Sequence, residues 1–217
     1  MKSVLSTKKL VPTQRETLRN AGWSLVEYDA IKVAYLSFEI SKNIENAIFT
    51  SQNAVRSFLE NEDGSKNRIS RCFCVGEKTQ KLLEENGLKV IKRAKNASNL
   101  AHFIIKEHQN NSFHFFCGNL KRDEIPSMLK TAKIDIFEVK VYETKLLLKH
   151  FDQNWDKILF FSPSAIKSFT AENQIGNSQV ICIGETTASE AKKYTNNIIL
   201  ATETTIDSVI NEAVKTH

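Results

Sequence analysis

The chain carries one pattern twice, first as Ile48-Phe-Thr-Ser-Gln-Asn-Ala-Val-Arg-Ser-Phe58 and again as Leu159-Phe-Phe-Ser-Pro-Ser-Ala-Ile-Lys-Ser-Phe169. Each copy reads as the end of an apolar strand, a hydroxyl-bearing turn at Ser51 or Ser162, and the first turns of an amphipathic helix. A second matched pair follows: Cys74-Val-Gly-Glu-Lys-Thr79 and Cys182-Ile-Gly-Glu-Thr-Thr187. The copies lie 111 residues apart (51 to 162) and 108 residues apart (74 to 182), which is too long for a solenoid repeat. The pattern predicts two related α/β domains.

The composition is that of an ordinary globular protein, since 41% of the 217 residues are hydrophobic and 25% are charged. No apolar run approaches the roughly 20 residues that span a bilayer, and the N-terminus lacks the apolar core of a signal peptide. We therefore expect a cytoplasmic protein without a membrane partner. The net charge of +5 suits a polyanionic ligand. The lysines are scattered and not interleaved with aromatic residues, which argues against nucleic acid.

The four cysteines show no metal-binding spacing. Cys72, Cys74, Cys117 and Cys182 form no C-x-x-C pair, and no histidine lies at ligand spacing. We expect reduced cysteines in the core and no bound metal.

Strands and helices alternate along most of the chain. Strands are expected at 3–5, 25–28, 47–50, 71–75, 89–92, 113–117, 136–143, 158–161, 180–183 and 198–201, and helices at 13–21, 53–61, 77–86, 99–109, 124–131, 165–171, 187–194 and 204–214. Residues 29–40 read as an extended connector, and 62–67 as a polar loop. The alternation predicts parallel sheets covered by helices on both faces.

The order of these units predicts a discontinuous first domain. The N-terminal strand–helix–strand unit is separated from its counterpart near the C-terminus by a whole domain. The simplest arrangement joins residues 1–30 to 146–217 as the first α/β domain and makes 38–141 the second. Residues 31–37 and 142–145 would form a two-stranded connector between them. We expect hinge motion and a ligand cleft between the domains.

Polar turns follow five of the expected strands. In parallel sheets such turns meet at one edge, where helix N-termini present free N–H groups that bind carboxylate or phosphate. The alternative is that the hydroxyl side chains only cap their own helices. The turns are Thr50-Ser51, Gly76–Thr79, Gly118-Asn119, Ser162–Ser164 and Gly184–Thr187, the last including Thr186.

Catalytic motifs of the familiar kinds are absent from the sequence. It contains no Walker loop, no G-x-G-x-x-G and no G-x-S-x-G elbow. An enzyme built this way would act by shaping and positioning a reactive substrate. Arg122 follows a strand end and could pair with a carboxylate, or it could be a solvated charge at a helix start. Tyr142 lies at the domain junction, where its phenol could face the cleft or its ring could pack the hinge.

The motifs, taken in order, resemble those of the uroporphyrinogen-III synthase family, and the resemblance covers nearly the whole chain. They are Ile48-Phe-Thr-Ser-x-x-Ala-Val, Val75-Gly-x-x-Thr79, Phe116-Cys-Gly-Asn-Leu-Lys-Arg122, Val141-Tyr-x-Thr144, Phe160-Phe-Ser-Pro-Ser164 and Ile183-Gly-x-Thr-Thr-Ala188. The resemblance implies two α/β domains, the first discontinuous, joined by a two-stranded connector with the active site between them.

The resemblance also implies the reaction. The substrate would be hydroxymethylbilane, a linear tetrapyrrole with eight carboxylates, which loses its hydroxyl to give an electrophilic azafulvene. Ring D attacks through its substituted position to form a spiro intermediate, and fragmentation and re-closure leave ring D inverted. Neither a cofactor nor a metal is implied. A monomer is expected, because no long apolar stripe argues for a dimer, and a transient handover of substrate from the upstream deaminase is conceivable.

Site residues follow from the same resemblance. Tyr142 would assist departure of the hydroxyl, and its change to Phe should weaken activity without abolishing it. Two turns depart from the family pattern, Ser6-Thr-Lys-Lys9 and the position of Gln80. The expected substrate contacts are Ser51, Thr79, Gly118, Asn119, Ser162, Ser164, Thr186 and Thr187, with Arg122 added from its position after a strand.

Two other classes of function remain open. A non-catalytic two-domain binding module for an anionic metabolite would show the same hinge and cleft. It would bind a tetrapyrrole without converting it. A methyltransferase or dehydrogenase with a degenerate nucleotide loop is the weaker alternative, because the glycine signature is missing.

Overall fold

The structure is a computed structural model that describes residues 2–40, 43–61 and 69–215. The polar loop expected at 62–67 lies outside these residues. The chain divides into two compact units, unit 1 with Met1–Lys32 and Lys145–His217, and unit 2 with Val33–Thr144. Each unit is an α/β sandwich whose sheet is mainly parallel, so the expected fold class is confirmed.

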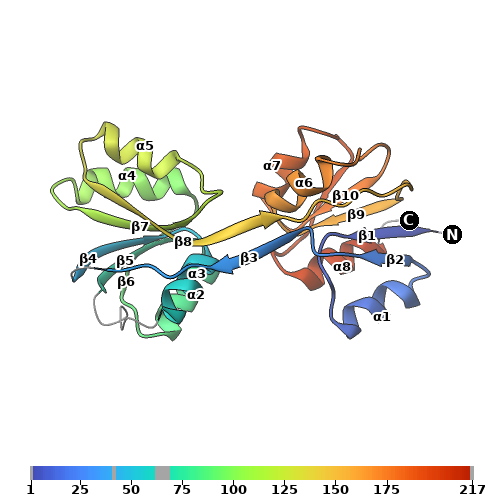
Figure 1. The fold of residues 1–217 in the computed structure, drawn as a ribbon, viewed down its shortest axis with the longest axis horizontal. Helices are drawn as coiled ribbons and strands as arrows, with labels where there is room; N and C mark the ends of the chain where they lie inside the picture. Colours follow the sequence, from blue (N-terminus) through green and yellow to red (C-terminus); the bar gives the residue numbers. More distant parts are fainter. Residues whose placement is uncertain (1, 41–42, 62–68, 216–217) are drawn as a thin grey trace. The chain divides into compact units, whose positions relative to one another are not determined.

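Unit 1 is a five-stranded parallel sheet in the order β11-β10-β9-β1-β2. Figure 1 shows α6 and α7 on one face of this sheet and α1 and α8 on the other. The strands are β1 (Ser3–Ser6), β2 (Ser24–Glu27), β9 (Lys157–Phe160), β10 (Gln179–Cys182) and β11 (Ile198–Leu200). The helices are α1 (Pro12–Asn20), α6 (Pro163–Thr170), α7 (Glu185–Ala191) and α8 (Ile206–Lys215).

Unit 2 is a six-stranded sheet in the order β3-β8-β7-β4-β5-β6. Helices α2 and α3 cover one face, and α4 and α5 cover the other (Figure 1). The strands are β3 (Ile31–Tyr35), β4 (Ile44–Phe49), β5 (Ile69–Val75), β6 (Val90–Ala94), β7 (Phe113–Gly118) and β8 (Ile136–Leu146). The helices are α2 (Gln52–Glu60), α3 (Glu77–Glu85), α4 (Ala97–Glu107) and α5 (Glu124–Thr131).

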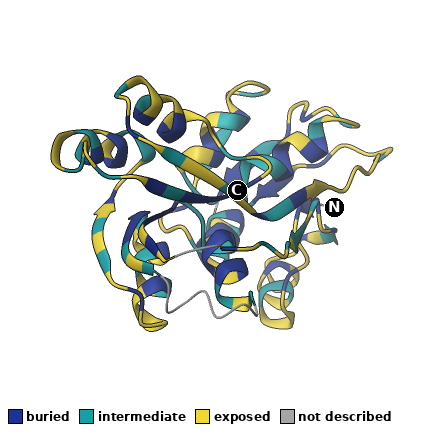
Figure 2. Ribbon diagram, turned by 60° about the vertical axis from the view of Figure 1, so that its left-hand side comes forward, coloured by how far each residue is buried: buried dark blue, intermediate teal, exposed yellow. Residues whose placement is uncertain are grey.

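Strand side chains alternate between two cores in each unit. In β9, Ile158 and Phe160 pack on the side of α6 and α7, whereas Leu159 packs on the side of α1 and α8. In β4, Phe49 belongs to the cluster under α2 and Ile48 to the cluster under α4 and α5. This period of two follows from the pleat of a strand. Figure 2 shows buried residues gathered on the strands and on one side of the helices.

Two elements differ from expectation at the chain crossings between the units. The stretch expected as an extended connector contains strand β3, which lies next to β8 in the sheet. Strand β8 continues to Leu146 and does not end at Glu143. Hydrogen bonds to neighbouring strands make β3 a strand and lengthen β8. The pattern of apolar residues within either segment does not predict such bonds. Among the described residues, no helix is both long and apolar enough to cross a lipid bilayer.

Candidate functional site

Two serines begin equivalent helices in the two units. Ser51 precedes α2, and its Oγ accepts a hydrogen bond from the Asn53 backbone N–H at 3.1 Å. Ser162 precedes α6, and its Oγ accepts from the Ala165 N–H, also at 3.1 Å. Both side chains are half-buried. Capping uses an acceptor lone pair only, so each hydroxyl can still donate its proton to a ligand. Capping and ligand contact are therefore compatible at both positions.

The remaining hydroxyl residues in these turns differ in exposure. Thr79 and Thr187 lie inside the first turns of α3 and α7 and are only 5% and 1% exposed. Thr186 is exposed and Ser164 is half-buried. Thr186, in α7, and Ser164, in α6, are thus more accessible than the two buried threonines.

Sheet order places the candidates of each unit along one edge. In unit 2, the strands that precede Gly118, Ser51 and Thr79 are β7, β4 and β5, which are consecutive in the sheet. In unit 1, β9 and β10 are neighbours, so the turns at Ser162 and Thr186 are adjacent as well. Each edge collects helix N-termini, which carry partial positive charge and favour anionic groups.

Tyr142 lies at the same edge of unit 2. It pairs with Gly118, the last residue of β7, and its ring packs half-buried against the cluster under α2. The glycine has no Cβ, and this leaves room for the ring, because a Cβ there would lie 2.4 Å from Tyr142 Cζ. The phenol hydroxyl makes no hydrogen bond to a described residue. The ring of Tyr142 is therefore fixed by packing, and its hydroxyl can still form a hydrogen bond with a ligand.

The side-chain carboxamide of Asn119 is hydrogen-bonded to the backbone of Thr144. Its Nδ2 donates to the Thr144 carbonyl at 3.1 Å, and its Oδ1 accepts from the Thr144 N–H at 2.8 Å. This pair of bonds resembles the two bonds between opposite residues of antiparallel strands. The Asn119 side chain therefore extends the pairing between β7 and β8 beyond the last residue of β7.

Lys121 and Arg122 are adjacent but differ in their partners. Lys121 Nζ lies 2.8 Å from Glu138 Oε2 and 3.1 Å from Asp123 Oδ1. The hydrogen bond with Glu138 raises the pKa of Lys121 and lowers that of Glu138. Arg122 is exposed and has no ion pair within the part of the chain that the structure describes. Of the two cations, Arg122 is the one able to bind a carboxylate.

Two lysines at the edge of unit 1 were missing from the candidates. Lys8 and Lys9 follow β1, the neighbour of β9, and both are exposed. Their turn is held by its own contacts, because Ser6 Oγ donates to the Lys8 carbonyl at 2.6 Å and the Lys9 N–H donates to Asp29 Oδ1 at 3.0 Å. Two basic residues directly after a strand were the available signal.

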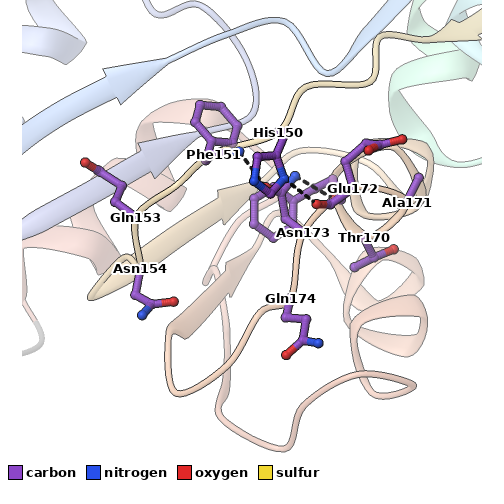
Figure 3. A pocket seen from close by; sticks show the side chains of 10 residues that line it. His150, Phe151, Gln153, Asn154, Thr170, Ala171, Glu172, Asn173 and Gln174 are labelled. Carbon is purple, nitrogen blue, oxygen red and sulfur yellow. Dashed lines mark hydrogen bonds between the residues drawn. The ribbon is translucent and has the colours of Figure 1, made fainter.

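A hollow in the described residues lies elsewhere in unit 1. It encloses about 650 Å³ between the segment before β9 and the segment after α6 (Figure 3). Those segments belong to the amino edge of the sheet, opposite the turns at Ser162 and Thr186. Its lining includes Glu172 and neither lysine nor arginine. This pocket is poorly suited to a ligand that carries several carboxylates.

The cysteines are buried and unpaired in both units. Burial raises the pKa of Cys72 and Cys182 to about 12 and that of Cys74 and Cys117 to about 11. Such thiols are neutral and unreactive near neutral pH. Among residues 2–40, 43–61 and 69–215, no three His, Cys, Asp or Glu side chains group in a way that could hold a metal ion.

Comparisons with known proteins agree on one family. The family model described as uroporphyrinogen-III synthase HemD matches residues 13–211. The porphyrin biosynthesis protein HemD of Ruminiclostridium josui is 26% identical over 248 aligned positions, which cover 99% of this chain and 49% of that protein. The chain thus spans about half the length of this curated relative.

Solved structures show the same fold. Uroporphyrinogen-III synthetase from Helicobacter pylori 26695 is 20% identical, with 99% of each chain covered and a TM-score of 0.69. A mutant uroporphyrinogen III synthase from the extremely thermophilic bacterium Thermus thermophilus is 10% identical, with 99% of this chain and 98% of that chain covered and a TM-score of 0.73. At such identities these two structures bear on the fold alone.

Proposed function

The chain belongs to the uroporphyrinogen-III synthase family, and from this premise we propose that it closes hydroxymethylbilane to uroporphyrinogen III, a cyclising lyase reaction that inverts ring D and releases water. One observation in the structure carries the proposal furthest. Tyr142 presents a hydroxyl without a described partner at the strand edge where helix N-termini collect. An acid group beside anion-binding turns is what departure of a hydroxyl from a polycarboxylate requires.

We propose that Tyr142 donates the proton with which the hydroxyl leaves. The C–O bond of the hydroxymethyl group breaks, and the hydroxyl leaves as water with the proton that Tyr142 donates. The resulting azafulvenium cation, which keeps its pyrrole N–H, is attacked by the substituted position of ring D. The spiro intermediate then breaks the bond between that position and its original bridging methylene, which leaves a second azafulvenium cation. In the last step the unsubstituted α-carbon of ring D forms the closing bond and loses its proton, which returns to the phenolate. No electrons are gained or lost overall, so the reaction requires neither oxidant nor reductant.

Each unit has turns that carry groups suited to binding carboxylates. Ser51 and Ser162 donate their hydroxyl protons while capping their helices, and Ser164 and Thr186 add accessible hydroxyls. Cations come from Arg122 of unit 2 and, in unit 1, from the exposed lysines after β1. Thr79 and Thr187 are buried in the first turns of α3 and α7. Binding by many fixed donors orients the substrate, and orientation decides which carbon of ring D attacks.

The setting of the reaction completes the proposal. We propose that the protein works in the cytoplasm as a monomer, without a cofactor, and that it takes its substrate by transient handover from the upstream deaminase. The balanced electron count supports the absence of a cofactor. Four unpaired cysteines support a reducing compartment.

Isomer analysis tests the function directly. Freshly made hydroxymethylbilane is incubated with the purified protein and no added cofactor, the products are oxidised, and isomers I and III are separated by chromatography. We expect isomer III to predominate, because the uncatalysed reaction closes without inversion and gives isomer I. Isomer I alone, at the rate of a protein-free blank, would favour a binding module that holds a tetrapyrrole without converting it.

Tyr142→Phe tests the acid. The variant keeps the ring and loses the proton donor, so we expect kcat to fall roughly 10- to 100-fold, at the low end of what a positioned acid contributes. Isomer III should still predominate, because the binding turns are unchanged. An unaltered kcat would remove Tyr142 from the proposed step.

A further inference from the structure

We propose that Asn119 is a positioning residue for Tyr142, acting through the main chain of Thr144 and making no contact of its own with the substrate. The structural part of this inference concerns the conformation of Tyr142 alone. Its consequence for turnover rests on the function proposed above.

The pairing between β7 and β8 is irregular at this point. Cys117 pairs with Lys140, but the next residue of β7, Gly118, pairs with Tyr142, so β8 contains one residue more than its partner. Val141 and Tyr142 follow one another, yet both pack on the cluster under α2. In a regular strand, successive side chains point to opposite faces. The irregularity is therefore what turns the Tyr142 ring onto Gly118.

A bulge of this kind interrupts the strand pairing and must be held by other bonds. On the near side, the Val141 carbonyl accepts from the Leu36 N–H at 2.9 Å and from the Ser57 hydroxyl. On the far side, β7 has already ended. The two bonds between the Asn119 carboxamide and the Thr144 peptide replace the missing strand. Tyr142 is thus held between two anchored peptides.

The same bonds use most of the polar groups of the Asn119 carboxamide. The carboxamide has one acceptor oxygen and two N–H donors, and Thr144 takes the oxygen and one donor. Thr144 is 8% exposed, and Asn119 itself is exposed. Loss of the carboxamide removes both bonds, and water in its place would not restrain the segment after Tyr142.

Fluorine NMR reads the conformation without turnover. The protein contains four tyrosines, and 3-fluorotyrosine labelling gives each one a resonance. The Tyr142 signal is the one absent from Tyr142→Phe. We expect Asn119→Ala and Asn119→Asp to shift or broaden this signal while circular dichroism stays that of a folded protein. Aspartate keeps the acceptor for the Thr144 N–H and loses the donor to its carbonyl, so it also tests the case in which alanine unfolds the protein.

Asn173 provides a matched control in unit 1. Its carboxamide makes the same kind of paired bonds, with Nδ2 donating to the Lys149 carbonyl at 2.7 Å and Oδ1 accepting from the Phe151 N–H at 2.8 Å. Asn173→Ala should leave the Tyr142 resonance in place. An unchanged resonance in both folded Asn119 variants, or an equal change in Asn173→Ala, would overturn the inference.

A double-mutant cycle connects the position to the reaction. We expect Asn119→Ala to lower kcat by about tenfold with KM nearly unchanged, as displacement of a catalytic group does. In the Tyr142→Phe background the same substitution should cost less than about twofold, because there is no longer an acid to position. A full tenfold loss in that background, or a loss confined to KM, would mean that Asn119 contacts the substrate itself. If neither form converts the bilane, the proposed function fails while the NMR result still decides the structural inference.

Discussion

Gly118 lies directly against the ring of Tyr142. A Cβ built on Gly118 would stand 2.4 Å from Cζ and 2.5 Å from Cε2 of the tyrosine, closer than carbon atoms approach one another. The backbone of Gly118 is not among the described glycines with positive φ. Glycine is therefore required here for the space it leaves and not for its backbone conformation.

Gly118→Ala should displace the Tyr142 ring. We expect the free energy of unfolding to fall by about 1–3 kcal/mol, the usual cost of overpacking, and kcat to fall by about tenfold or more. Denaturant titration and the isomer assay measure the two effects. The control removes the ring: in a Tyr142→Val background the three atoms nearest the added methyl group are gone, and the methyl group should cost less stability. An equal cost in both backgrounds would show that another neighbour opposes the methyl group.

Charge at the helix caps separates capping from substrate binding. Ser162→Asn and Ser162→Asp both keep a side chain that caps α6, since Asn and Asp are as good as Ser at this position. The aspartate also favours the helix N-terminus by roughly 0.3–1 kcal/mol. We expect Ser162→Asp to be as stable as the unchanged protein, with KM for hydroxymethylbilane raised about tenfold or more by repulsion of a carboxylate. Ser162→Asn should show nearly normal KM.

Equal KM values in the two variants would place the substrate carboxylates away from Ser162. The same pair of substitutions at Ser51, which caps α2 in unit 2, tests the equivalent turn. Melting temperatures measured alongside KM ensure that any loss of affinity does not arise from loss of the helix.

We expect the pKa of His150 to lie above 6.5 and the pKa of His114 to lie below it. The Glu172 carbonyl and the nearby Asp152 carboxylate raise the pKa of His150, and burial lowers the pKa of His114. The stability contributed by His150 is present below pH 6.5 and is lost as pH rises through its folded pKa. The contribution of His114 is present above pH 6.5 and is lost as pH falls through its folded pKa. NMR titration of the imidazole signals, assigned with single His→Gln variants, measures both values. A His114 pKa above that of His150 would contradict the burial argument.

The thiols should be protected in the folded protein. Burial raises the pKa of all four, to about 12 for Cys72 and Cys182. Because the thiolate is the nucleophile, we expect iodoacetamide at pH 8 to leave the native protein unmodified and to add up to four groups after unfolding in guanidinium. Mass spectrometry counts the adducts. Fast modification of a single cysteine in the native state would indicate local opening around that residue.

Much of the fold could be predicted from the sequence, because it depends on interactions between residues close together in the chain. The caps at Ser51 and Ser162 depend on a hydroxyl and the next three residues, so the repeated pattern was sufficient to place α2 and α6. The alternation of apolar residues likewise marked β4 and β9. The length of β8 and the pairing of β3 could not be read this way. Both depend on hydrogen bonds to strands that are distant in sequence.

The sequence by itself determined the α/β class, the duplicated strand–turn–helix units and the family, because each follows from spacings within a few residues or from an ordered set of short motifs. Only the tertiary structure decided what the candidate residues do. In the tertiary structure Thr79 and Thr187 are buried, and Lys121 forms an ion pair with Glu138. Arg122 has no ion pair with a described residue, and the carboxamide of Asn119 is hydrogen-bonded to the backbone of Thr144. The tertiary structure also set the Tyr142 ring on Gly118, through a register shift between two strands whose residues lie more than twenty positions apart. Such contacts depend on how distant segments pair and pack, and short-range sequence patterns carry no information about them.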